Sequence, residues 1–75
     1  MSTIADRLKE LRKRCSLSQK QISIAVEINE RTYRRYEAGD IEPSASNINK
    51  LADYFQVSTD YLLGRTDKIE SLQNE

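Results

Sequence analysis

The chain has 75 residues, of which 37% are hydrophobic and 32% are charged, so its length allows one small folded domain. A domain of this size has no room for a large substrate cavity, and no apolar run approaches the roughly 20 residues that a membrane helix needs. The charged N-terminal residues do not resemble a signal peptide, so we expect a cytoplasmic protein. Without histidine and with a single cysteine, the chain is expected to have no disulfide, metal site, cofactor or enzyme activity.

The net charge is zero, but the charges are unevenly distributed along the chain. Residues 1–36 contain nine basic and four acidic residues, a net charge of +5. Residues 37–75 contain three basic and eight acidic residues, a net charge of −5. This asymmetry fits a protein that presents one basic face to an anion. Solvated helices with no ligand explain the same numbers equally well, so the asymmetry alone assigns no function.

The first half of the chain has the spacing and the end signals of three helices. Apolar residues recur at helical spacing from Ile4 to Cys15, which predicts a first helix there with a buried thiol at its end. Ser18 and Gln21 have the spacing of a capping box, which predicts a second helix over about 19–26.

A third helix is expected over residues 30–38. Asn29 suits its N-cap and Gly39 suits the position after its last residue. Because only residues 27–29 separate it from the second helix, the turn between the two helices must be tight.

Two more helices are expected after Pro43, which disfavours helical backbone in the residue before it. Ser44 caps a fourth helix with an apolar stripe that ends at Phe55, and Ser58 caps a short fifth helix over 59–63. Gly64 ends the predicted domain, 1–64, and a polar tail follows over 65–75, for which a short extra helix capped by Thr66 and containing Ile69 and Leu72 is considered. Five short helices joined by tight turns predict an all-α bundle.

The third predicted helix carries an unusual concentration of arginine. Tyr33 and Tyr36 share one side and suit the core, which leaves four residues on the opposite side: Arg31, Arg34, Arg35 and Ala38. Arginine binds guanine edges or phosphates in a bidentate manner, and a helix fits the major groove of DNA. A solvated basic face without a ligand is the alternative, but three arginines on so short a helix favour nucleic-acid binding.

The segment LSQKQISIAVEINERTYRRYEAG, residues 17–39, resembles the helix-turn-helix of the lambda-repressor-like, Cro/C1-type (XRE-like) transcriptional regulators. The resemblance continues to Gly64 and covers about residues 4–64. It implies a five-helix DNA-binding domain, with a positioning second helix, a recognition third helix and double-stranded DNA as the partner.

The resemblance also implies roles for single residues. The residues expected to contact DNA bases are Glu30, Arg31, Thr32, Arg34 and Arg35. Those expected to contact phosphates are Gln19, Lys20 and Asn29. Gln19 would also brace the recognition helix, and Arg31 is the first candidate for a guanine contact. Glu30 either accepts a hydrogen bond from cytosine N4 or only complements the helix dipole. Glu27 stands where many relatives have glycine, so we expect strained backbone there.

The resemblance further implies a homodimer on a palindromic operator, because one such domain buries little DNA surface. Candidate dimer contacts are Leu62, Leu63, Ile69 and Leu72, and packing back onto the bundle is an equally good interpretation of these residues. Repression by occupying a promoter is the simplest outcome. The alternatives are an antitoxin that binds both DNA and a toxin, a pure protein-interaction domain, and an enzyme, which the missing histidine and the small core disfavour.

Overall fold

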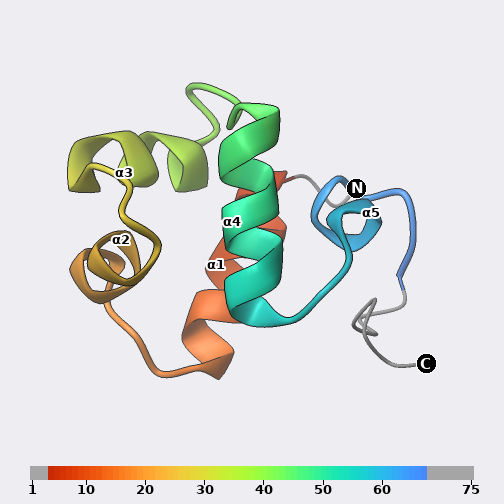
Figure 1. The fold of residues 1–75 in the computed structure, drawn as a ribbon, viewed down its shortest axis with the longest axis horizontal. Helices are drawn as coiled ribbons and strands as arrows, with labels where there is room; N and C mark the ends of the chain where they lie inside the picture. Colours follow the sequence, from red (N-terminus) through yellow and green to blue (C-terminus); the bar gives the residue numbers. More distant parts are fainter. Residues whose placement is uncertain (1–3, 68–75) are drawn as a thin grey trace.

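A computed structural model describes residues 4–67 of the chain. Five helices follow one another in this range: α1 (Ile4–Arg14), α2 (Gln19–Val26), α3 (Glu30–Ala38), α4 (Ala45–Phe55) and α5 (Thr59–Leu62). Helices α2 and α3 lie at one end of the molecule and α5 at the other, with α1 and α4 between them (Figure 1). The described residues include no strand, and the predicted all-α five-helix fold is confirmed.

All five helices contribute to one hydrophobic core. The largest fully buried side chains come one from each helix in turn: Leu8, Ile22, Tyr33, Leu51 and Leu62. Helix α1 packs against α3 and α5, and α2 packs against α3 and α4. Since each helix buries a single stripe in this shared core, no helix is stable without the others.

The helix starts have the predicted caps. The Ser18 hydroxyl accepts from the Gln21 N–H, and the Gln21 side chain accepts from the Ser18 N–H, which confirms the capping box. The Asn29 side chain accepts from the first free N–H groups of α3. Ser44 and Ser58 cap α4 and α5 in the same way. Each cap satisfies N–H groups that have no partner inside the helix.

The turn between α2 and α3 contains strained backbone, as expected. Glu27 has φ of +58°, in the left-handed region that costs an L residue about 1 kcal/mol. Its N–H donates to the Ile24 carbonyl, and the Ile28 N–H donates to the Ser23 carbonyl. These bonds close the end of α2 and bring α3 directly onto it. Gly39 ends α3 with φ of +81°, which glycine adopts without strain.

Two predictions about helix ends are wrong. Helix α1 ends at Arg14, and Cys15 is exposed rather than buried. The chain turns at Ser16, which has φ of +58°, so Cys15 leaves the apolar stripe of the helix that its spacing had suggested. Helix α5 ends at Leu62, one residue earlier than predicted, because Leu63 already belongs to the turn before Gly64.

None of the helices described over residues 4–67 combines the length and the apolar character needed to cross a membrane. The same part of the chain has no group of His, Cys, Asp or Glu side chains that could hold a metal ion.

Candidate DNA interface

Helix α3 has two contrasting faces. Tyr33, Tyr36 and Glu37 are buried against the other helices. The opposite side holds the four residues assigned to it from the sequence, and all of them are exposed: Arg31, Arg34, Arg35 and Ala38. We call the three exposed arginines of this side the arginine face. Its guanidinium groups are available to a ligand without any change in the fold.

The three arginines differ in their surroundings. Arg34 donates from Nη2 to the Glu30 carboxylate at 2.7 Å, one helical turn earlier. Among residues 4–67, neither Arg31 nor Arg35 takes part in a salt bridge. These two also stand four positions apart on the helix, where like charges repel each other. An anion placed against the arginine face would relieve that repulsion.

The remaining candidate contacts lie at the starts of α2 and α3. Gln19 begins α2 and is half-buried, and the next residue, Lys20, is exposed. Asn29 is exposed, and its side-chain oxygen, Oδ1, already accepts hydrogen bonds from the N–H groups of Arg31 and Thr32. Thr32 is half-buried in the first turn of α3. Of these four residues, Lys20 is the one that is charged and exposed, whereas the Gln19 amide already donates to a carboxylate inside the molecule.

Behind the arginine face lies a buried polar cluster that the sequence reasoning missed. Its centre is the Glu37 carboxylate, whose side chain is 2% exposed. Arg12 of α1 donates to it through Nε at 2.7 Å and through Nη2 at 3.1 Å. Gln19 of α2 donates at 3.0 Å, and the Tyr33 hydroxyl donates a short hydrogen bond from the same helix. We call these four residues the Glu37 cluster. It ties α1 and α2 to α3.

The Glu37 cluster shifts the titration of its members. Burial alone would raise the pKa of Glu37, but hydrogen bonds from Arg12, Tyr33 and Gln19 outweigh it, so this pKa lies below its usual value. Burial, together with the neighbouring Glu37 carboxylate, raises the pKa of the Tyr33 hydroxyl strongly. The hydrogen bond to Glu37 raises the pKa of Arg12. At neutral pH the cluster thus contains an ionised acid–base pair and a neutral tyrosine.

One signal in the sequence could have revealed this cluster. Glu37 follows Tyr33 by four residues, so it shares the side of the helix assigned to the core. A carboxylate on a core face needs a cation or several donors. No sequence pattern said that Arg12 would supply them from another helix. The expected bracing role of Gln19 has a structural counterpart in its hydrogen bond to Glu37.

The second tyrosine of α3 also has a partner. The Asn47 side chain of α4 donates to the Tyr36 hydroxyl at 2.8 Å. Over residues 4–67, no buried side-chain nitrogen or oxygen lacks a hydrogen bond. Both tyrosines of α3 therefore fit the core, because their hydroxyls are satisfied.

Some of the basic residues in the N-terminal half are used inside the fold and are not exposed to a ligand. Arg7 is buried, with its guanidinium 4.0 Å from the centre of the Tyr61 ring. It donates to the Asp67 carboxylate at 2.9 Å and to the Thr66 carbonyl at 3.3 Å. Arg7 thus holds the segment after α5 against α1. With Arg12 in the Glu37 cluster, two of the nine basic residues counted in the first half stabilise the fold.

The candidate dimer residues have separate outcomes. Leu62 is fully buried in the core. Of the two interpretations considered for it, packing onto the bundle is therefore the one that the structure shows. Leu63 is 37% exposed and stays available to a partner. Ile69 and Leu72, and the extra helix considered for them, lie outside the described residues.

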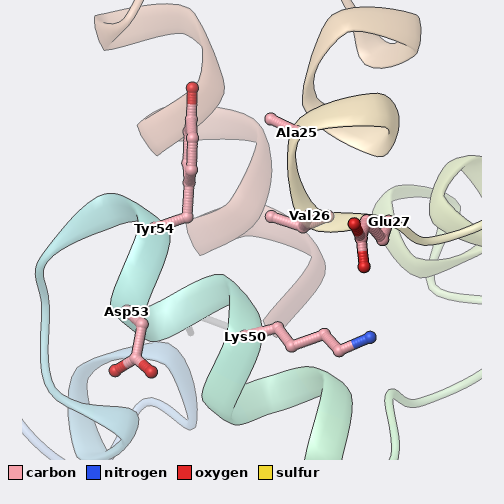
Figure 2. Close-up of a pocket in the computed structure, with 6 residues that line it drawn as sticks. All are labelled: Ala25, Val26, Glu27, Lys50, Asp53 and Tyr54. Atoms are coloured by element: carbon pink, nitrogen blue, oxygen red, sulfur yellow. The ribbon is translucent and has the colours of Figure 1, made fainter.

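A shallow hollow lies between the end of α2 and α4, away from the arginines of α3. Figure 2 shows Lys50 extending from α4 toward the turn that holds Glu27, with Tyr54 and Asp53 further along the same helix. Ala25 and Val26 complete its lining. It brings none of the expected DNA-contacting residues together.

Comparison with known proteins agrees with this architecture. A family model described as helix-turn-helix matches residues 8–62. The transcriptional repressor RstR of the cryptic phage CTXphi, from Vibrio cholerae, is 35% identical over 71 residues, which cover 92% of this chain and 63% of the relative. The regulator AnsR of Bacillus subtilis is 42% identical over 60 residues, which cover 80% and 52%. The chain therefore spans between half and two thirds of the length of these relatives.

Solved structures show the same fold. The P22 c2 repressor, crystallised with a synthetic operator, superposes with a TM-score of 0.79 at 25% identity, covering 84% of this chain and 96% of the repressor chain. A transcriptional regulator from Listeria innocua gives a TM-score of 0.77 at 29% identity, covering 97% and 65%. The chain belongs to the helix-turn-helix family, in agreement with its resemblance to the Cro/C1-type regulators.

Proposed function

We propose that this chain is a sequence-specific DNA-binding transcriptional regulator, and that residues 1–64 form its DNA-binding domain. The observation that carries the proposal is the arginine face of α3, exposed on a helix whose opposite side is anchored in the core. Regulator and repressor relatives support it, as does the fold shared with a repressor crystallised on its operator. Repression by occupying a promoter is the simplest mode of action.

In this mechanism α3 enters the major groove and reads base edges. Arg31 and Arg35 are the main donors to guanine, since neither has a salt-bridge partner within residues 4–67. Thr32 lies beside them in the first turn. Gln19, Lys20 and Asn29 contact phosphates from the helix starts and fix the position of the protein on the duplex. The Glu37 cluster keeps α3 at a constant angle to α2, so the arginines meet the groove in one orientation.

The protein would bind a palindromic operator as a homodimer. One domain of this size covers about 600–1,000 Å² of DNA interface, and two half-sites one helical turn apart supply the rest. Leu63 is the exposed candidate for the dimer contact in the described part of the chain, and Ile69 and Leu72 are candidates beyond it.

The test is selection of bound duplexes from a random pool by the purified full chain, repeated with Arg31→Ala. We expect a palindromic motif in which the variant loses its preference at one guanine. Arg14→Ala is the matched control, because Arg14 is an exposed arginine on α1. It should leave the motif unchanged. A folded wild-type protein that enriches no motif would overturn the proposed function.

A further inference from the structure

We infer that Glu30 reads a cytosine in the operator and that Arg34 is a positioning residue that holds the Glu30 carboxylate in place. This inference rests on the proposed function. It divides the arginine face into two residues that contact bases, Arg31 and Arg35, and a third, Arg34, that orients the Glu30 carboxylate.

The geometry of the pair supports this division. The Arg34 Nη2–Glu30 Oε2 distance is 2.7 Å, whereas the other i, i+4 pair in the described helices, Arg14–Glu10, is at 3.6 Å. The Glu30 side chain is 33% exposed, against 51% for Glu10. Glu30 is thus the more enclosed and more tightly held carboxylate. Within residues 4–67 its second oxygen, Oε1, accepts no hydrogen bond and retains its lone pairs for a ligand.

The chemistry of the groove then selects the base. An ionised carboxylate only accepts hydrogen bonds. In the major groove cytosine offers the N4 amino donor, guanine and thymine offer acceptors at their polar edges, and adenine places the N7 acceptor beside its donor. A carboxylate at the first position of α3 therefore favours cytosine, is repelled by the acceptors of guanine and thymine, and meets at adenine a donor offset by the neighbouring N7 acceptor. Arg34 cancels the charge of Glu30 beside the phosphates, which lets an acid approach DNA at all.

The experiment compares the motifs selected from a random duplex pool by the full-length wild type, Glu30→Gln and Arg34→Gln. Glutamine pairs with adenine through N6 and N7, so Glu30→Gln should convert one cytosine position of the motif to adenine, with a change in preference of roughly tenfold. Arg34→Gln should weaken the preference for cytosine at that same position without creating one for adenine. Thermal unfolding of each variant checks that the exposed substitutions leave the fold intact.

Glu10→Gln is the matched control. It removes the same charge from an i, i+4 glutamate–arginine pair on α1, so it should raise general DNA affinity slightly and leave every motif position unchanged. A motif unaltered by Glu30→Gln would overturn the inference while leaving the proposed function standing. Loss of a different position in Arg34→Gln would show Arg34 to be a reader and overturn its positioning role. Failure of the wild type to select any motif would overturn both proposals.

Discussion

The two faces of α3 use the same kinds of side chain in opposite ways. On the buried face, the Glu37 carboxylate is held by a guanidinium from α1, an amide from α2 and a phenol from its own helix. On the outer face, Arg31 and Arg35 are exposed, and Arg34 is the one salt-bridge partner of Glu30 among residues 4–67. The charge on the buried face is paired within the molecule, whereas the exposed charges of the outer face are accessible to a partner. The number of charged residues on a helix therefore does not say how many are available for binding.

The buried face should be the more sensitive to substitution. Arg12→Met removes the main cation of the Glu37 cluster and leaves a carboxylate that is 2% exposed without its charge partner. We expect the free energy of unfolding to fall by about 3 kcal/mol, measured by urea denaturation.

The double variant Arg12→Met/Glu37→Gln serves as its control, because it removes both charges together. It should recover part of the lost stability. A loss below about 1 kcal/mol in Arg12→Met alone would contradict the role of the cluster.

The contribution of the buried face to stability should depend on pH through Glu37. Glu37→Gln should lose about 2 kcal/mol at pH 7, because a neutral amide makes weaker bonds with Arg12 and Tyr33. The pKa of Glu37 is lower in the folded chain than in the unfolded chain, so its contribution is present above about pH 4.3 and is lost as the pH falls through the folded-state pKa.

The measurement is urea denaturation of wild type and Glu37→Gln at pH 7, 5 and 3. The difference in stability between the two proteins should shrink toward pH 3. A difference that stays constant over this range would show that folding does not lower the pKa of Glu37.

The outer face should respond in binding and not in stability. Arg35→Ala should weaken binding to the selected operator by about tenfold, with no shift in the unfolding temperature, because the side chain is exposed and lacks a salt bridge among the described residues. Fluorescence anisotropy with labelled duplex measures the first effect and calorimetry measures the second. Arg14→Ala on α1 is the control. Equal losses of DNA affinity in both variants would show that α3 contributes no more to binding than any exposed arginine.

The smallest effect on stability is expected for the salt bridge between the buried Arg7 and the exposed Asp67. Asp67 pairs with the buried Arg7, yet its own side chain lies fully in solvent. Asp67→Asn should leave the unfolding temperature unchanged, since Arg7 keeps the Tyr61 ring and the Thr66 carbonyl as partners. A measurable decrease would show that Arg7 depends on the carboxylate itself.

Local signals predicted most of the fold. Ser18 with Gln21, Asn29, Ser44 and Ser58 all act within a few residues of where they stand, so the starts of four helices were readable from spacing alone. The exposed and buried sides of α3 followed from the helical period in the same way. Cys15 shows the limit of this method, because it lies just after the last residue of α1, where the helical period no longer decides which side chains are buried.

Spacing and capping signals along the chain were enough to predict five helices, their order and the group of arginines on the third. It could not say which charges are used inside the molecule, because partners such as Arg12 and Glu37 lie 25 residues apart and meet only when α1 packs against α3. The same holds for Arg7, whose partners come from the far end of the described chain. Periodicity and capping act between near neighbours along the chain. Whether a charged side chain is buried and paired or exposed depends on which residues the tertiary fold brings beside it.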